Sequence, residues 1–263
     1  MPNVVIVGGG ISGLALAYRL QQANPAAEIT LLERNDRPGG TVWTERHDGF
    51  QVECGPNGFL DTKPATLDLC RDLGLGDRLV AASEAASRNR YLLLGGRLRR
   101  LPTGPLGFLT TDVLSLRGKL AVLAEPFRRR GRGGDESVDA FARRRLGNEA
   151  ADVLVDAFVT GIFAGDPKRL SVRAAFPRLA ELEERHGSLI RGFGRSAKER
   201  RREAAARGQP YQRPGKMWSF REGLRLLIET LRDRLRTPPV LGVSVKRVER
   251  QETGWLVHGE GQD

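Results

Sequence analysis

The first 32 residues alternate between short apolar runs and a helical pattern. Asn3 to Val7 is rich in β-branched residues and ends in glycines, Ile11 to about Gln22 carries apolar residues at helical spacing, and Glu28 to Leu32 is a second apolar run. This order predicts a strand, a glycine turn, a helix and a second strand. Two parallel strands joined through a helix imply a right-handed crossover and a sheet covered on both faces.

A different pattern begins at about Tyr91, where segments rich in Leu, Ala and Arg are separated by prolines and glycines. Four of these segments are typical of helices, some with Ser or Asn at the cap position: Ser115 to Glu125, Ser137 to Leu146, Asn148 to Thr160 and Arg173 to Glu184. A fifth, Arg195 to Arg207, is charged nearly all round. We expect this last segment to be a solvated helix or connection.

Alternating strand and helix patterns return after residue 214. Glu222 to Arg236 places its apolar residues on one helical stripe, and Val240 to Val248 and Trp255 to His258 are typical of strands. We therefore predict an α/β fold in which a Rossmann-like dinucleotide-binding domain is interrupted by an inserted, mainly helical substrate or membrane domain. The predicted parts are residues 1–90, 91–214 and 215–263.

Positive charge is concentrated in the middle of the chain. The net charge is +11, and residues 91–214 contain 25 Lys and Arg against 14 Asp and Glu. Such a segment attracts nucleic acid, anionic lipid or an acidic small molecule through the same long-range field. No nucleic-acid motif accompanies it, so nucleic acid is not expected as a partner, and an anionic membrane surface or an acidic small molecule stays open.

Cysteine, histidine and apolar content indicate the environment. Cys54 and Cys70 lack metal-ligand spacing, and the three histidines have no helix-spaced partner, so we expect reduced thiols and no metal site. We find neither a signal peptide nor an uncharged apolar run of about 18 residues. We expect a cytoplasmic protein, with peripheral contact to the inner face of the membrane left open. Packing roles are expected for Trp43, Trp218 and Trp255.

Gly8, Gly10 and Gly13 form a G-x-G-x-x-G motif between the first predicted strand and the helix. Glycines there allow a tight turn, close approach of backbone to a pyrophosphate and close packing of helix on strand. Glu33 follows 20 residues after Gly13, where a carboxylate can accept hydrogen bonds from ribose hydroxyls. The motif predicts a dinucleotide site that also includes Gly9, Ile11 and Ser12, and an NAD-dependent enzyme would share it.

The stretch after Glu33 is more specific. It contains Arg34, Gly39, Gly40 and Thr41, and then Gly55, Pro56, Asn57 and Gly58. This pattern resembles the flavin-binding signature of the flavin amine oxidase superfamily, in which the double glycine and the G-P-N turn run close to the flavin. The resemblance implies FAD as the cofactor, bound largely by main-chain groups of these residues. A basic residue often stands in that superfamily where Thr41 stands here.

Further blocks narrow the resemblance to the oxygen-dependent protoporphyrinogen oxidases. They are Asn89 to Leu92 with Leu101 to Gly104, and Gly161 to Pro167 with Leu170 and Ser171. A third block, Ser219 to Leu224, is similar to an F-x-G-G-L pattern, with Glu222 in place of a usual glycine. The resemblance implies that Arg90 faces a propionate of the substrate, that backbone at Gly161 lies near the substrate, and that Val245 contacts adenine through its backbone.

The resemblance implies oxidation of protoporphyrinogen IX or coproporphyrinogen III to the porphyrin in haem biosynthesis, with dioxygen as acceptor. It implies no catalytic side chain, because the flavin carries the chemistry, and it allows a homodimer. Members of this family are longer, so we expect the C-terminal flavin-contacting segment and the rest of the substrate domain to be missing from these 263 residues. Three alternatives stay open: another flavin oxidase or desaturase, a non-catalytic FAD-binding fragment, and a basic protein that binds membranes or nucleic acid.

Overall fold

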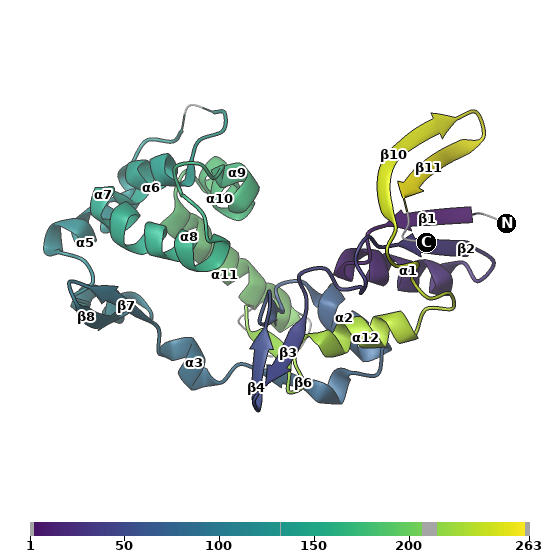
Figure 1. Cartoon of the computed structure of the whole chain (residues 1–263). Coiled ribbons are helices and arrows are strands. Elements are labelled where there is room, and N and C mark those ends of the chain that lie inside the picture. The colour runs from purple at the N-terminus through teal and green to yellow at the C-terminus, as the bar shows by residue number, and fades with distance from the viewer. Residues whose placement is uncertain (1–2, 132, 207–214, 261–263) are drawn as a thin grey trace. The chain divides into compact units, whose positions relative to one another are not determined.

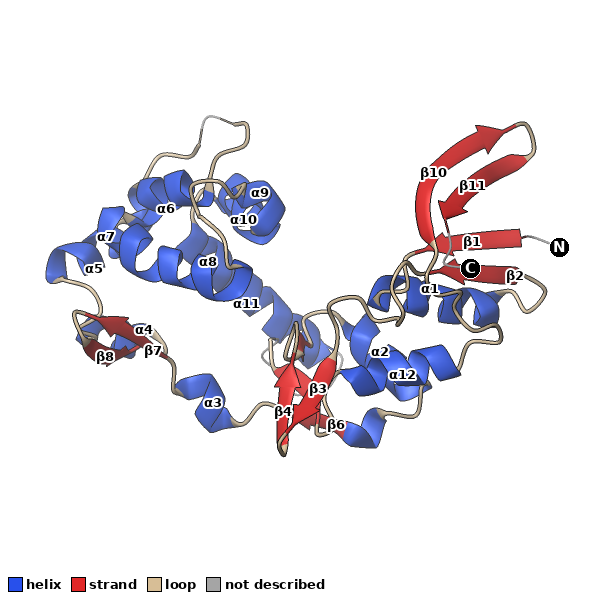
Figure 2. Cartoon of the chain, viewed as in Figure 1, coloured by secondary structure: helices blue, strands red, loops and turns tan. Residues whose placement is uncertain are grey.

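The first three elements form the predicted β-α-β unit (Figure 1). β1 (Asn3–Val7) and β2 (Glu28–Leu32) pair in parallel, with Val5 opposite Thr30, and α1 (Ile11–Ala23) connects them. The structure is a computed structural model that describes residues 3–131, 133–206 and 215–260. Its combination of helices and strands confirms the predicted α/β fold (Figure 2).

The chain divides into two compact units. Unit 1 combines residues 1–82 with 213–263, and unit 2 comprises residues 83–212. The divisions therefore lie at 82/83 and 212/213, where the sequence pattern places them at 90/91 and 214/215.

Unit 1 contains the β-α-β unit, two β-hairpins and a small antiparallel sheet. Its strands form the antiparallel pairs β3–β4 and β10–β11 and a three-stranded sheet of order β5-β9-β6. The remaining elements of unit 1 are β3 (Thr44–His47), β4 (Phe50–Glu53), β5 (Phe59–Leu60), α2 (Pro64–Asp72), the 3-10 turn η1 (Gly76–Arg78), β6 (Leu79–Ala81), β9 (Met217–Phe220), α12 (Arg225–Asp233), β10 (Ser244–Gln251) and β11 (Gly254–Glu260).

The core of unit 1 is built from both ends of the chain. Leu14 on α1 and Cys70 on α2 are buried together with Ile228 and Leu231 on α12. Only one face of the β1–β2 pair is covered, because Ile6 is buried whereas Val5 and Val7 are exposed. The expectation of a sheet covered on both faces is therefore wrong for the described residues, since α1 and α12 pack on the same core.

Unit 2 is mostly helical, and its β7–β8 hairpin is antiparallel (Figure 2). Its core contains Val138, Phe141, Val159, Val172 and Leu189. The elements are α3 (Glu84–Arg88), β7 (Tyr91–Leu94), β8 (Arg97–Arg100), α4 (Pro105–Thr110), α5 (Leu116–Leu123), the 3-10 turn η2 (Glu125–Phe127), α6 (Val138–Leu146), α7 (Asn148–Ala150), the π-helical turn η3 (Ala151–Val155), α8 (Asp156–Phe163), α9 (Val172–Ala175), α10 (Pro177–His186) and α11 (Leu189–Ala206).

Three helix predictions need correction. The segment Arg173 to Glu184 is divided at Phe176, because Pro177 lacks an N–H and disfavours helical backbone in the residue before it. The charged helix starts at Leu189, well before Arg195, and residue 207 lies outside the described residues. Glu222 does not begin α12, because Gly223 has a φ of +91° and Arg225 is the first helical residue.

The first predicted strand after α12 is shifted toward the C-terminus, and the second is longer than predicted at both ends. Val240 makes only an isolated parallel bridge to Leu32, and the paired strand starts at Ser244. Val240 to Val243 thus extends the edge of the β1–β2 pair before the chain turns into the β10–β11 hairpin. Among the described residues, no helix is both long and apolar enough to cross a bilayer.

Candidate functional site

The glycine loop joins β1 to α1. The amide of Gly8 donates to the carbonyl of Leu32 over 2.7 Å, which holds the loop against the end of β2. A Cβ on Gly13 would collide with the carbonyl oxygen of Gly8, so helix and loop can approach this closely only at glycine. A Cβ on Gly10 would meet no protein atom within 4 Å, so the space above Gly10 is open.

The N-terminus of α1 is free to receive an anion. Gly10 occupies the cap position without a side-chain cap, and the first turn carries no acidic residue. The first N–H groups of α1, from Ile11 and Ser12 onward, therefore point their partial positive charge out of the helix end. Such an end binds phosphate through main-chain groups alone.

Glu33 is buried beneath this loop. Its Oε2 accepts the amide of Gly9 over 2.7 Å, and its Oε1 accepts the amide and side-chain nitrogen of Asn35 over 2.9 and 2.7 Å. The carboxylate therefore holds the glycine loop in place, a role that the sequence motif does not reveal. Oxygen lone pairs left over can accept a ribose hydroxyl. The neighbouring Arg34 side chain is exposed.

The second glycine turn lies against the first. The amide of Gly39 donates to the carbonyl of Gly9 over 2.7 Å, and the position of a Cβ on Gly40 lies 3.7 Å from the Cα of Gly10. Thr41 follows with an exposed side chain, and its carbonyl oxygen occupies the space that a Cβ on Gly55 would need. The structure thus brings together the predicted residues of the two glycine segments.

The segment between α12 and β10 contributes backbone beside the end of β2 in unit 1. The amide of Val243 donates to the carbonyl of Glu33 over 2.9 Å, which places Val245, two residues later, at the start of β10 next to the end of β2. Gly58 instead packs on β9, where a Cβ would lie 2.7 Å from the carbonyl oxygen of Trp218. Pro56 and Asn57 are exposed between these two places.

These features fit a dinucleotide cofactor. Open space lies above glycines at a helix N-terminus, a buried carboxylate closes the end of β2, and the backbone of a third segment runs past that carboxylate. Main-chain groups and helix dipole would hold the pyrophosphate, and Glu33 would accept the ribose hydroxyls.

The segment Ser219 to Leu224 leads into α12, whose N-terminus is hydrogen-bonded to the β3–β4 hairpin. The hydroxyl of Thr44 donates to Glu53 over 2.8 Å and accepts the amide of Arg225 over 3.0 Å, and Glu53 accepts the amide of Leu224 over 3.1 Å. A Cβ on Gly223 would collide with Thr44, so this glycine is required. The capping of α12 by β3 and β4 was not predicted, because it joins segments far apart in sequence.

Glu222, which stands where the family pattern has a glycine, has a partly exposed side chain. It accepts a hydrogen bond from Arg78 over 2.6 Å, and this guanidinium holds the pKa of the Glu222 carboxyl below its ordinary value. A side chain longer than glycine is therefore accommodated at position 222 by an ion pair within unit 1.

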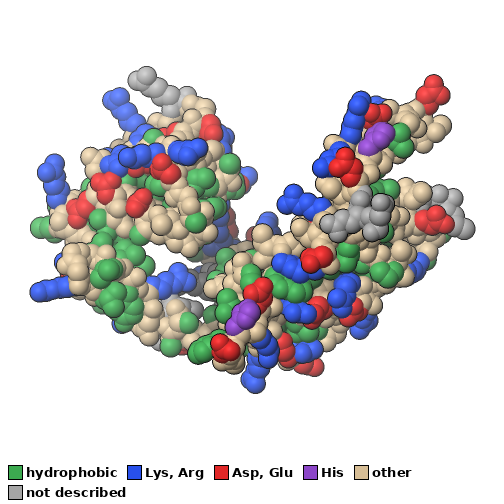
Figure 3. All heavy atoms as spheres, in the orientation of Figure 1, with side chains coloured by type: hydrophobic (Ala, Val, Ile, Leu, Met, Phe, Trp, Pro, Cys, Tyr) green, Lys and Arg blue, Asp and Glu red, His purple; other side chains and the backbone are tan. Residues whose placement is uncertain are grey.

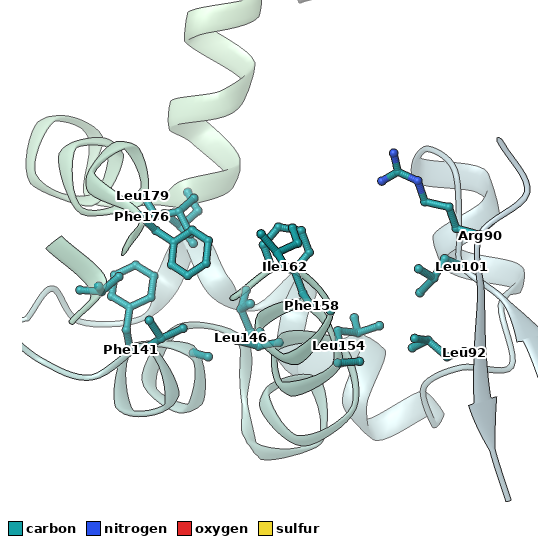
Figure 4. A pocket seen from close by; sticks show the side chains of 17 residues that line it. Arg90, Leu92, Leu101, Phe141, Leu146, Leu154, Phe158, Ile162, Phe176 and Leu179 are labelled. Atoms are coloured by element: carbon teal, nitrogen blue, oxygen red, sulfur yellow. The ribbon is translucent and has the colours of Figure 1, made fainter. Parts of the chain in front are cut away.

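Unit 2 contains an apolar pocket of about 520 Å³. Arg90 and Gly161, the two substrate residues implied by the resemblance, both line it (Figure 4). Among the described lining residues Arg90 alone is charged. Figure 4 shows Arg90, Leu92 and Leu101 on one wall, across from Leu154, Phe158 and Ile162. The pocket thus offers a broad apolar surface with one carboxylate-binding group.

The wall opposite Arg90 comes from helices around a π-helical turn. π-helical turns often occur at functional sites, and η3 contributes the pocket residues Leu154 and Val155, with Ala157 and Phe158 following on α8. Phe176 lies 5.8 Å from Phe158 and 5.3 Å from Phe163, measured between ring centres. Sequence reasoning missed this aromatic wall, because helically spaced apolar residues have the same pattern in a core and in a pocket.

The chain matches the flavin-containing amine oxidoreductase family over residues 11–263. It belongs to that family. It is 37% identical to protoporphyrinogen oxidase 1 of Arabidopsis thaliana chloroplasts over 259 residues, which cover 96% of this chain and 48% of that protein. It is 35% identical to coproporphyrinogen III oxidase of Staphylococcus aureus over 238 residues, which cover 87% of this chain and 50% of that protein.

Solved structures agree with this assignment. A crystal structure assigned as a protoporphyrinogen oxidase from Exiguobacterium superposes with a TM-score of 0.73 at 30% identity, covering 98% of this chain and 56% of that one. Putrescine oxidase superposes with a TM-score of 0.63 at 19% identity, covering 99% of this chain and 55% of that one, and so shares the fold. FAD is the cofactor of this family. The chain spans about half the length of the curated relatives it matches.

Proposed function

We propose that this flavin-containing amine oxidoreductase takes part in the FAD-dependent oxidation of a porphyrinogen to a porphyrin, with dioxygen as the acceptor. One observation supports this above all others: Arg90 and Gly161, separated by helices α4 to α7, line the same apolar pocket. Relatives named protoporphyrinogen oxidase and coproporphyrinogen III oxidase share 35 to 37% identity with the chain.

In this reaction the residues of this chain bind the cofactor and the substrate and orient them. FAD, when bound, supplies two-electron oxidation. The Gly8 to Gly13 loop and the N-terminus of α1 receive its pyrophosphate, and Glu33 receives its ribose. The apolar pocket walls exclude water from a macrocycle, and the planar guanidinium of Arg90 can bind one carboxylate through two N–H groups.

The pocket favours the substrate with fewer carboxylates. Protoporphyrinogen and coproporphyrinogen differ in carboxylate count, and each buried carboxylate without a partner is costly. Because Arg90 is the single charged lining residue in the described part of the chain, we propose protoporphyrinogen as the preferred substrate.

Flavin absorbance and porphyrin fluorescence test this proposal. The purified chain should show flavin bands and form porphyrin in air faster than the spontaneous reaction, with protoporphyrinogen preferred over coproporphyrinogen. Gly10→Val should fold normally, since Gly10 has a φ of −68° and open space at Cβ, but lose the flavin bands. Gly194→Val, at an equally open helical glycine in α11, should keep them.

The outcomes separate the alternatives. Flavin bands without porphyrin formation would favour a non-catalytic FAD-binding fragment. Turnover of an amine and not of porphyrinogen would favour another oxidase of the family. Absence of flavin from the wild-type chain would overturn the proposal.

We further propose that unit 2 contacts an anionic membrane surface on the cytoplasmic side. Leu116, Leu120 and Leu123 form one stripe on α5 with exposed fractions of 73%, 57% and 45%, and Phe127 beside them is 84% exposed. Figure 3 shows hydrophobic side chains gathered over this part of unit 2. Basic residues interleave with the stripe at Arg117 and Lys119. Apolar side chains flanked by basic ones suit an anionic lipid interface.

Sedimentation with vesicles tests the membrane proposal. The chain should bind vesicles that contain phosphatidylglycerol at low salt, and phosphatidylcholine vesicles far less. Leu120→Asp should abolish binding, whereas Leu16→Asp, at an exposed leucine of α1, should not. A homodimer that Leu120→Asp dissociates, without vesicle binding, would assign the stripe to a second copy of the chain instead.

A further inference from the structure

The indole ring of Trp43 contacts side chains from two parts of the chain: Arg37, beside the second glycine turn, and Arg225, at the start of α12. The guanidinium carbons of Arg37 and Arg225 each lie over this ring, 4.2 Å from its centre. A guanidinium over the face of tryptophan is attracted by the negative potential of the ring. Residues from two segments far apart in sequence therefore meet on one aromatic side chain.

Arg37 connects the indole to the turn itself. Its Nη1 donates to the carbonyl of Gly40 over 3.3 Å and to that of Pro38 over 3.4 Å. The turn is closed by the amide of Val42, which donates to Gly39 over 3.0 Å. An Arg37 side chain held by Trp43 thus fixes the direction of the Gly40 carbonyl, next to Gly10 of the glycine loop.

Arg225 connects the indole to α12. Its Nε donates to Glu229 over 2.7 Å, and its amide donates to Thr44 over 3.0 Å, so the arginine is fixed at both ends. A Cβ on Gly39 would lie 3.0 Å from the side chain of Ile228, which shows that the turn rests directly on the same helix. Trp43 therefore links the turn to a rigid element of the core.

Removing the ring would remove the surface that attracts both guanidinium groups. The ring of Trp43 attracts the guanidinium groups of both Arg37 and Arg225. Without an aromatic face, Arg37 keeps its hydrogen bonds to the turn but loses the attraction that holds its side chain in one place.

We propose that Trp43 is a positioning residue that holds the Gly39–Gly40 turn in the shape that receives FAD. The inference rests on the proposed FAD site, and it assigns to Trp43 a role beyond the packing expected from the sequence. The indole acts through Arg37 and the turn, so an aromatic ring of another kind should serve in its place.

Hydrogen exchange of the FAD-free chain tests the link to the turn. Trp43→Leu should speed exchange of the Gly39 and Val42 amides about tenfold, the amount expected for loss of one or two cation–π contacts, while amides of α2 stay unchanged. Trp43→Phe, which keeps an aromatic face, should restore most of the protection. Trp255→Leu, at an exposed tryptophan of β11, should change neither amide.

FAD affinity tests the consequence. Trp43→Leu should raise the dissociation constant for FAD about tenfold and Trp43→Phe less than threefold. Equal affinity of wild type and Trp43→Leu, or a Phe variant as weak as the Leu variant, would overturn the inference. Should Trp43→Leu not fold, Arg37→Gln breaks the same link with the indole in place and should give the same faster exchange. A wild-type chain that binds no FAD would contradict the proposed function. The hydrogen-exchange data, which need no FAD, would still test whether Trp43 holds the turn.

Discussion

Gly161 leaves room in the pocket at a cost in helix stability. A glycine inside a helix is about 1 kcal/mol less favourable than alanine, and Gly161 lies within α8. A Cβ there would meet no protein atom within 4 Å, and the residue lines the apolar pocket. The open volume beside Gly161 is therefore part of the space available to a ligand.

Gly161→Leu should fill that space. We expect porphyrin binding, measured by fluorescence quenching, to weaken at least tenfold, because an isobutyl group would occupy volume that the macrocycle needs. The midpoint of thermal unfolding should not fall, since leucine is the better helix former. Gly194→Leu, also helical and also open at Cβ, should leave porphyrin affinity unchanged. Unchanged affinity in Gly161→Leu would exclude this pocket as the porphyrin site.

Single residues differ in how far the sequence predicts them. Gly13 and Glu33 follow from local spacing, because a strand, a turn and a helix in succession fix where they lie. Arg90 and Gly161 came from a resemblance, and no spacing rule would have placed them in one pocket. The contact between Trp43 and Arg225 depends on how α12 packs, so the local pattern around Trp43 predicts packing alone.

At the level of elements, α11 begins on a buried carboxylate. Glu125 accepts the amides of Leu189 and Ile190 over 2.8 and 3.3 Å and the hydroxyl of Ser188 over 2.6 Å. Its other partner is the guanidinium of Arg145, and both side chains are completely buried. Burial opposes the charge of Glu125, but the Ser188 hydroxyl, the amides and Arg145 outweigh it and hold the pKa of this carboxyl below its ordinary value.

The lowered pKa of Glu125 predicts acid sensitivity. The unfolded chain then binds the proton more readily than the folded one, so the stabilisation is complete above the unfolded pKa of about 4.3 and is lost as pH falls through the folded pKa. Glu125→Gln should cost about 3 kcal/mol at pH 7, because the buried Arg145 would keep only the more distant carboxylate of Glu183, 3.4 Å away, as its counter-charge. Urea unfolding should show this difference shrinking as the pH is lowered below 4.3.

A matched control separates this buried pair from surface charge. Glu181→Gln removes an exposed partner of Arg185 one turn along α10, and such pairs contribute little. A Glu125→Gln chain as stable as Glu181→Gln at pH 7 would contradict the assignment.

α12 takes its N-terminal cap from another element. Leu224 at the cap position provides no side-chain oxygen, and Thr44 and Glu53 from the β3–β4 hairpin serve instead. Thr44→Val keeps the shape but removes the hydroxyl, which should cost about 1–2 kcal/mol in denaturant unfolding. Thr230→Val, which removes a hydroxyl bonded only within α12, should cost less. Equal losses would mean that the cap contributes nothing of its own.

Element boundaries were predicted less well than element types. The β-α-β unit has the predicted order because each apolar run is bounded by glycine or proline signals. The start of α12 was misplaced, since the predicted helix began at Glu222, whereas the positive φ of Gly223 keeps that residue out of the helix. Phe176 likewise separates α9 from α10 although the apolar spacing is continuous.

For the whole molecule, the insertion point of unit 2 decides whether unit 1 folds by itself. β6 and β9 flank the insertion and are antiparallel neighbours, with Ala81 opposite Trp218. The amide of Ala82 donates to the carbonyl of Met217 over 2.8 Å, so the two ends of the insertion meet in one ladder. Loops of two to five residues are the usual connections between strands in this arrangement.

A chain in which Ala82 is joined to Gly215 through Asn-Gly should therefore fold as unit 1. We expect cooperative urea unfolding and FAD affinity within about threefold of the full chain, because every residue of the core and of the glycine loops is kept. Residues 1–82 alone should not unfold cooperatively, since Phe220, Ile228 and Leu231 supply the other side of that core. Cooperative folding of residues 1–82 without them would show that α12 is dispensable, and a rejoined chain without cooperative unfolding would show that unit 1 needs unit 2 to fold.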